Sequence, residues 1–544
     1  MFKLASIDSA GAALKEDQED LQYILKASVP GLVSESLRPA VSSTEHNNAS
    51  DGAATGHRLL IEPSVFNISL LLPPSLSFLN RLKEVVPTGS GIVLSTLPSF
   101  LDDFLVNVFF PSLEDTIRDL FAQTTGDLDA FQEDPNWTKI SKKPIMKGTT
   151  AFLDLITAFC KMLDTLPPDQ AFGQLTIDLL TSYYDKCYEW YKDLVSRIGT
   201  DEDEDANADM KMSARWAQNE VVRQAMNKLY ADEGKTPPKD LYKLETDADL
   251  AHKGPDPIAA TDLITDRKAI HSLCILSTSM KWIASKVVQL RHIEGAERFS
   301  RNDGGNSGRL RRRWTLIDAL RLNDEGRPIY LPMTTETVGA FDGVVSSFQE
   351  LSTTILFTLR AEARTRTIHY LYKSLAEGNY CLESTVTTPD THILALNSDL
   401  CWFDEDISTA LGPHETSFIL CGLGHLMDHL LISWASLIKL LNRAGAERMR
   451  TNILVLQQNL KNIEKSSDLG RAARFYGLYE TGMKKIIEDA KKGEIEFAFD
   501  ELKVIVELYF SEAMNNRRES AAALQARRSL NEGLLQLSEI MWTL

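Results

Sequence analysis

One apolar seam constrains what this chain can fold into more than any other feature. It lies in residues 449–463, MRTNILVLQQNLKNI, where the apolar positions are separated by four, three, four and three residues. This spacing places side chains on one side of an α-helix. The residues of the apolar seam are Met449, Ile453, Leu456, Leu460 and Ile463. The sequence therefore predicts a helix that packs through this side.

Neutral amides accompany the apolar seam, and they are Asn452, Gln458, Asn459 and Asn462. An amide donates and accepts hydrogen bonds but is neither an acid nor a base near neutral pH. This segment is therefore expected to pack and to be hydrogen-bonded rather than to carry out a reaction. The candidate packing and interaction residues are Ile453, Leu456, Asn459, Leu460 and Ile463.

The length and the charge of the chain limit its class. Its 544 residues are too many for one compact core, so several packed units are expected. The formal net charge is −18. This acidic balance argues against binding of duplex nucleic acid, which requires clustered positive charge, and against adhesion of the whole surface to anionic lipid.

Helical periodicity recurs along most of the chain, without a fixed-period repeat. Two clear helical faces are Phe152, Ile156, Phe159 and Leu163, and Phe348, Leu351, Ile355 and Leu359. Long helices with short breaks predict an all-α fold of consecutive irregular helical bundles. Residues 233–257 are interpreted as a long connection, and residues 380–399 as a Thr-rich interruption.

The predicted organisation has five segments. They are a mostly disordered lead-in at 1–57, a first helical bundle region at 58–200, a second helical region with long acidic and polar loops at 201–345, a third helical bundle at 346–465 and a C-terminal helical bundle at 466–544.

No catalytic signature emerges from the motifs. Gly234-Lys235-Thr236 lacks the upstream glycine of a phosphate loop, and Asp102-Asp103 lacks a third acid. Cys421, His425 and His429, at i, i+4 and i+8, could share one helix side and hold zinc, but no fourth ligand is evident. The alternative is that the histidines are ordinary packing residues. The sequence thus predicts no catalytic residue, no cofactor and no metal ligand.

The compartment is predicted from the cysteines and from apolar length. Six widely spaced cysteines indicate free thiols in a reducing compartment. Residues 418–441 are long and apolar enough to suggest a membrane span, but they include His425, Asp428, His429 and Lys439. Because such charges are costly in lipid, a buried bundle helix in a cytosolic protein is expected.

A basic run stands out in this acidic chain, and its arginines are Arg309, Arg311, Arg312 and Arg313. It could bind anionic lipid head groups or an acidic partner. The alternative is a solvated helix start or a set of ion pairs within the chain.

Four strings, in collinear order, carry a family resemblance. They are Glu377-Gly378-Asn379-Tyr380, Leu396-Asn397-Ser398-Asp399, Gly422-Leu423-Gly424-His425-Leu426, and Asn-Ile-x-Val-Leu-Gln-Gln-Asn-Leu-x-Asn-Ile at 452–463. Together they resemble the C-terminal, helical-rod portion of the exocyst complex component 4 family.

The resemblance implies an elongated rod of helical bundles and a scaffold role in the exocyst, which tethers secretory vesicles to the plasma membrane before SNARE-mediated fusion. It implies other exocyst subunits as partners, especially component 3, with indirect membrane association, and no enzymatic activity. The expected location is the cytoplasm, with recruitment to plasma membrane sites of polarised secretion. Two alternatives remain: a helical adaptor of another membrane-trafficking complex, and a metal-dependent helical enzyme.

Overall fold

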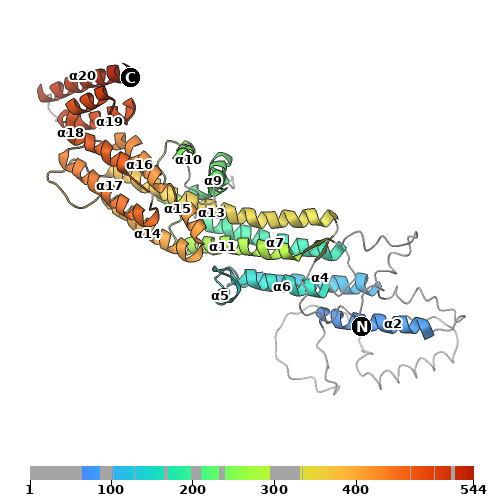
Figure 1. Ribbon diagram of the computed structural model, residues 1–544. Coiled ribbons are helices and arrows are strands. Elements are labelled where there is room, and N and C mark those ends of the chain that lie inside the picture. The colour runs from blue at the N-terminus through green and yellow to red at the C-terminus, as the bar shows by residue number, and fades with distance from the viewer. Residues whose placement is uncertain are drawn as a thin grey trace, which may run out of the picture. The chain divides into compact units, whose positions relative to one another are not determined.

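A computed structural model describes most of the chain (Figure 1). The described residues are 64–85, 101, 103–127, 129–163, 170–197, 210–231, 239–293, 331–333, 335–465, 467–494, 496–515 and 521–543. By its internal contacts the chain divides into two units, Met1–Leu70 and Leu71–Leu544. The following concerns the second unit, together with helix α2, Ile68–Val85, which begins in the first. The predicted lead-in at 1–57 and the predicted basic run lie outside the described residues.

Helices account for nearly all regular structure in the described part of the chain. The first half contains α4 (Phe110–Gly126), α5 (Trp137–Ile140), α6 (Lys147–Leu163), α7 (Gln170–Val195), α8 (Met212–Gln218), α9 (Glu220–Ala231), α10 (Lys239–Lys253) and α11 (Arg267–Val287). The second half contains α13 (Thr335–Glu377), α14 (Thr391–Ala410), α15 (Pro413–Leu420), α16 (Leu423–Ser433), α17 (Arg443–Ile463), α18 (Gly470–Lys492), α19 (Phe499–Met514) and α20 (Ala521–Thr543). Short 3₁₀ or π segments are η1 (Val65–Asn67), η2 (Leu105–Phe109), η3 (Ala260–Asp262), η4 (Val288–Leu290) and η7 (Ala435–Leu437).

The prediction of an all-α fold is confirmed. The two named strands of the described residues, β1 (Arg291–Ile293) and β2 (Leu331–Met333), form one short parallel pair. The predicted segment boundaries remain predictions; α13 continues through the position proposed for one of them, at 345/346.

Aromatic side chains fill the contact between α6 and α7. Phe152 stacks on Tyr183 with ring centroids 4.2 Å apart, and the Tyr183 hydroxyl lies 2.8 Å from the Thr149 hydroxyl. The predicted α6 face is buried, because Phe152, Ile156, Phe159 and Leu163 are all at most 2% exposed. Large aromatic surfaces removed from water in this way stabilise the first group of helices.

Helix α13 is the central element of the second unit. It packs against α7, α8, α11, α14, α15 and α16. The predicted apolar face from Phe348 to Leu359 is buried, as expected. The helix is also buried on its other sides between residues 351 and 369, where it carries several charged side chains. Those charges therefore need partners on neighbouring helices.

Two predicted irregular segments are partly helical. Residues 233–257, interpreted as a connection, contain α10, and residues 380–399 contain the first half of α14. Helix α14 begins early because Asp390 caps it, accepting a hydrogen bond from the His392 backbone N–H at 3.0 Å. Helix α10 buries Glu245 and Asp249, so its inward side has no apolar periodicity to reveal it.

The apolar segment at 418–441 is buried inside the helical protein. Among the described residues, Pro413–Ser433 is long and apolar enough to cross a membrane, by length and composition only. Its apolar side chains from Phe418 to Ile432 are at most 5% exposed. The chain turns between α15 and α16 at Gly422, whose φ of 81° is in the left-handed region that glycine adopts readily.

Candidate interaction surface

The apolar seam lies on α17, as its spacing predicts. Asn442 caps the start of the helix, with its side-chain oxygen accepting from the Gly445 N–H at 2.8 Å. Met449, Ile453, Leu456 and Leu460 are at most 3% exposed, and Ile463 is half-buried. Helix α17 packs on α14, α16 and α18. The structure therefore places the first four seam residues in the core and the fifth at its edge.

Asn452 connects α17 to the segment that follows α13. Its Oδ1 accepts from the Asp390 N–H at 2.8 Å, and its Nδ2 donates to the Tyr380 hydroxyl at 3.3 Å. The backbone also approaches closely here, since a Cβ at Gly445 would lie 1.7 Å from the Tyr380 carbonyl oxygen. Glycine is therefore required at 445 for this contact.

Asn459 connects α17 to α14. Its Nδ2 donates to Asn397 Oδ1 at 3.1 Å, and its Oδ1 accepts from the Cys401 thiol at 3.2 Å. Asn459 is only 9% exposed. Gln458 and Asn462, by contrast, are exposed, so only part of the predicted amide set is used for packing.

The four strings that carry the family resemblance meet around α17. Tyr380 contacts Asn452, Asn397 contacts Asn459, and a Cβ at Gly424 would lie 1.8 Å from the hydroxyl of Ser467, four residues after the end of α17. Segments separated by tens of residues in sequence are thus joined at one place. Their residue types are those that hydrogen bonding and close backbone approach require.

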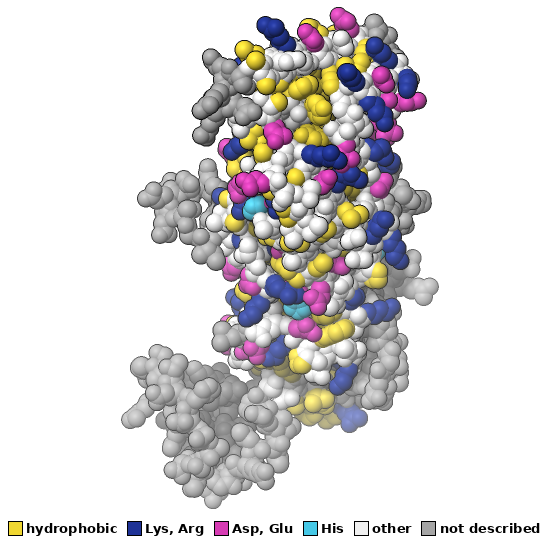
Figure 2. Space-filling view, turned by 90° about the vertical axis from the view of Figure 1, so that its left-hand side faces the viewer, with side chains coloured by type: hydrophobic (Ala, Val, Ile, Leu, Met, Phe, Trp, Pro, Cys, Tyr) yellow, Lys and Arg dark blue, Asp and Glu magenta, His cyan; other side chains and the backbone are white. Residues whose placement is uncertain are grey.

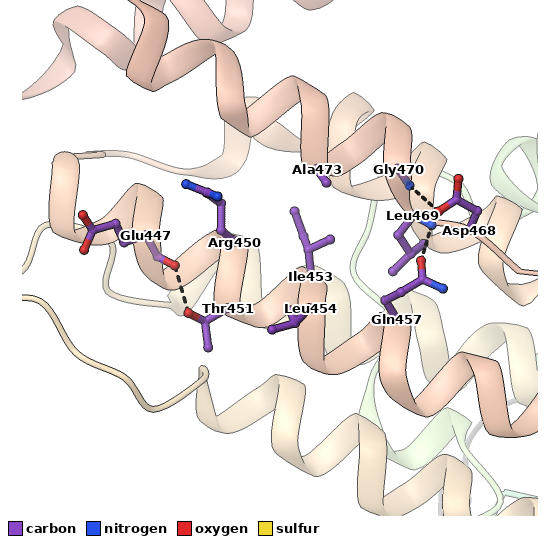
Figure 3. Close-up of a pocket in the computed structure, with 10 residues that line it drawn as sticks. All are labelled: Glu447, Arg450, Thr451, Ile453, Leu454, Gln457, Asp468, Leu469, Gly470 and Ala473. Atoms are coloured by element: carbon purple, nitrogen blue, oxygen red, sulfur yellow. Dashed lines mark hydrogen bonds between the residues drawn. The ribbon is translucent and has the colours of Figure 1, made fainter.

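A groove lies between α17 and α18 (Figure 3). It encloses about 500 Å³. Its apolar lining comprises Ile453, Leu454, Leu469 and Ala473, and its polar lining comprises Glu447, Arg450, Thr451, Gln457, Asp468 and Gly470. Leu454 is 58% exposed. An exposed leucine beside a hollow is a suitable contact for an apolar side chain of a partner.

The groove is held in shape by hydrogen bonds at one end. The side-chain amide of Gln457 donates to the Ser467 carbonyl at 2.8 Å and accepts from the Leu469 N–H at 2.5 Å. These bonds fix the turn from α17 to α18, as Figure 3 shows for Gln457 and Leu469. At the other end Arg450 pairs with Glu480 of α18 at 2.8 Å. These contacts at both ends hold α17 and α18, and with them the apolar lining, in a fixed relative position.

A buried ionic cluster between α10 and α13 was not predicted from the sequence. Arg360 donates through two nitrogens to the two oxygens of Glu245, both at 2.6 Å, and both side chains are fully buried. Arg364 pairs with Asp249 and donates to the Thr246 hydroxyl at 3.0 Å. One signal was present: the two acids and the two arginines each stand four residues apart, which gives matching helix faces.

The two acids of this cluster differ in acidity. Burial raises the pKa of Glu245, but Arg360 and Arg364 lower it more, so that it lies below its usual value. Burial raises the pKa of Asp249 to about 6, against the opposing effect of Arg364. Paired charges that are so well buried serve here to dock α10, because breaking one pair would leave its partner uncompensated.

A second buried group joins α13 to α14 and to the segment before α11. Arg366 donates to Glu362 at 2.9 Å and to both oxygens of Asp399 at 2.8 Å. Glu362 also accepts from the Ile264 backbone N–H at 2.8 Å. The Leu396–Asp399 string thus supplies hydrogen-bond partners to α13, through Asp399, and to α17, through Asn397.

The cysteine and the two histidines do not share one helix, contrary to the spacing argument. Cys421 precedes the turn at Gly422, whereas His425 and His429 lie on α16. The Cys421 sulfur accepts from Arg360 at 3.3 Å. In the part of the chain that the structure describes, no group of three or more His, Cys, Asp or Glu residues could hold a metal ion. Burial lowers the pKa of both His425 and His429. The neighbouring His429 lowers the pKa of His425 further.

Comparison with known proteins finds similarity to components of the exocyst. The family model described as exocyst complex component Sec8 C-terminal matches residues 1–76. A Neurospora crassa protein named probable exocyst complex component sec8 is 38% identical over all of this chain and 54% of its own length. Exocyst complex component sec8 of Schizosaccharomyces pombe is 24% identical over 92% of the chain and 47% of its own length. Human exocyst complex component 4 is 22% identical over 78% of the chain and 43% of its own length.

The chain is thus similar to subunits of the exocyst, and the resemblance found in the four strings is confirmed. The relatives that it matches are named sec8 or exocyst complex component 4. It spans about half the length of the curated relatives that it matches.

Proposed function

We propose that this chain is a scaffold subunit of the exocyst and helps to tether secretory vesicles to the plasma membrane before SNARE-mediated fusion. The observation that supports this most strongly is the 38% identity, along the whole chain, to a relative named as an exocyst component. The runner-up function is a helical adaptor of another membrane-trafficking complex.

The described surface suits a scaffold. Several buried polar side chains beneath it join helices, as Asn452, Arg360 and Arg366 illustrate. The α17–α18 groove offers an apolar contact with a polar rim, which is typical of protein interfaces. We therefore propose a non-enzymatic role, with the groove as one contact for another subunit. Among the exocyst subunits, we propose component 3 in particular as a partner.

The same proposal gives a location. A scaffold of this kind would be cytoplasmic and recruited, through the assembled complex, to plasma membrane sites of polarised secretion. The arginines at 309–313 would add attraction to acidic head groups if they face the membrane.

Affinity purification of the tagged chain from its own cells tests the proposal, with the co-purifying chains identified by mass spectrometry. Recovery of exocyst subunits, and of component 3 in particular, is expected. Deletion of residues 466–544 should weaken that recovery, because it removes α18 and with it one wall of the groove. Recovery of a different trafficking complex without exocyst subunits would favour the adaptor instead.

A further inference from the structure

The last helix, α20, has two contrasting sides. Its inward side is built from small residues and one leucine, with Ala523, Ala526 and Leu537 at most 9% exposed. The contact is close, because a Cβ at Gly533 would lie 2.2 Å from the Met483 methyl group of α18. Helix α20 packs in this way on α18 and α19. Its outward side is therefore held in a fixed orientation.

The outward side carries an apolar stripe made of Leu524, Leu535 and Trp542. These side chains are 55%, 65% and 87% exposed. They are separated by eleven and seven residues, close to three and two whole helical turns, so they lie along one line of the helix. On the one face of the molecule that Figure 2 presents, hydrophobic side chains lie scattered among charged ones. Exposed tryptophan in such a line is typical of a contact surface.

We propose that the α20 stripe pairs with the same stripe of a second copy of this chain, with the two helices antiparallel. The stripe is self-complementary about Gly533, since Leu524 and Trp542 both lie nine residues from it. A two-fold axis there places Leu524 of one copy against Trp542 of the other. Both leucines at position 535 then meet near the axis.

Charge favours the antiparallel arrangement over the parallel one. Arg528 and Glu539 each follow a stripe leucine by four residues, so they lie on the same flank of α20. In a two-fold antiparallel pair the same flanks meet, and Arg528 of one copy faces Glu539 of the other. In a parallel two-fold pair opposite flanks meet, so Arg528 of one copy would not face Glu539 of the other. Glu539 also has a partner within its own chain, so the added ion pair contributes only modestly.

The expected association is weak. A helix of 23 residues is about 34 Å long, and one pair of such helices buries less than the roughly 1,200 Å² of a stable interface. A micromolar or weaker, concentration-dependent dimer is the consequence. This inference goes beyond the proposed function, because it concerns the purified chain alone.

Sedimentation of the purified chain tests the pairing over about a hundredfold range of concentration around the expected micromolar Kd. A monomer–dimer equilibrium is expected. Leu535→Asp and Trp542→Ala should each weaken it about tenfold or more, because both remove stripe contacts. Leu394→Asp, which changes an exposed leucine on α14, is the matched control and should leave the equilibrium unchanged. Equal melting temperatures would show that the variants fold.

Charge reversal tests the register separately. Arg528→Glu and Glu539→Arg should each weaken the dimer, and the double variant should restore it. A chain that stays monomeric at every concentration would overturn the proposal and leave the stripe to another partner. A dimer that is insensitive to Trp542→Ala, or a double reversal weaker than both single ones, would equally overturn it. None of these outcomes affects recovery of exocyst subunits from cells.

Discussion

The side-chain nitrogen of Asn452 lies 3.3 Å from the hydroxyl of Tyr380, although 72 residues separate them in the sequence. The same amide accepts from the Asp390 N–H at 2.8 Å. The Tyr380 hydroxyl also lies 2.9 Å from the Ser374 hydroxyl at the end of α13. One amide thus joins α17, the end of α13 and the start of α14.

Asn452→Ala should therefore destabilise the chain, because the buried Asp390 N–H would lose its acceptor. An unsatisfied buried donor costs about 1–3 kcal/mol. Urea unfolding followed by circular dichroism would measure the difference. Gln458→Ala, on the exposed side of the same helix, is the control and should change little. A similar midpoint for both variants would contradict the role given to Asn452.

Leu456→Asp tests the apolar seam. Leu456 is fully buried on α17, and an unpaired carboxylate there costs several kcal/mol, on the order of the largest single-residue effects. Lys461→Asp, at an exposed position of the same helix, should be nearly neutral. Thermal melting distinguishes them. If the two variants melt at the same temperature, the seam does not hold the C-terminal helices together.

Arg360→Met tests the ionic docking of α10. It leaves Glu245 buried beside Arg364 alone, at 3.3 Å, and loss of one member of a buried pair costs about 3–5 kcal/mol. Replacing both members, as Arg360→Met with Glu245→Leu, should recover much of that loss in chemical denaturation. Arg443→Met, whose side chain is 88% exposed, serves as the control. A double variant as unstable as Arg360→Met would show that the cost comes from packing rather than from charge.

The α16 histidines predict a dependence of stability on pH. Burial lowers the folded-state pKa of His425 below 6.5, and Arg364, His429, Asp247 and Glu245 are the charged or titratable groups around it. Between that pKa and about 6.5 the unfolded chain binds more protons, so stability rises with pH. The stability that neutral His425 contributes is fully present above about pH 6.5 and is lost as the pH falls toward the folded-state pKa.

His425→Gln should flatten that dependence below about pH 6.5. The comparison with the unchanged chain is needed because Asp249 acts in the opposite direction. Its raised pKa, about 6, favours the folded state as the pH falls below that value. The free energy of unfolding, measured across this range for both proteins, gives the two slopes. Identical slopes would mean that His425 has the same acidity folded and unfolded.

Apolar periodicity in the sequence predicted which apolar side chains are buried. It did not predict the buried ion pairs, which join residues far apart in the sequence. Leu456 and Phe152 stand at helical spacing among apolar neighbours, so their burial followed from pattern alone. Glu245 and Asp249 stand in a segment interpreted as a long connection, and the arginines that neutralise them are 115 residues away in the sequence. The groove beside Leu454 was likewise hidden, since it exists only where α18 lies against α17.

The last prediction concerns the groove as a contact within the exocyst. Leu454 is exposed and lies beside Ile453 and Ala473 on the groove lining, so Leu454→Asp should leave folding intact but disfavour an apolar partner side chain there. Leu394→Asp is the matched control, because Leu394 is 45% exposed on α14 and does not line the groove. The tagged variants are expressed in their own cells, and the co-purifying exocyst subunits are quantified. Several-fold lower recovery with Leu454→Asp than with Leu394→Asp is expected. Equal recovery with both, in a chain that still brings down exocyst subunits, would place the contact elsewhere on the surface.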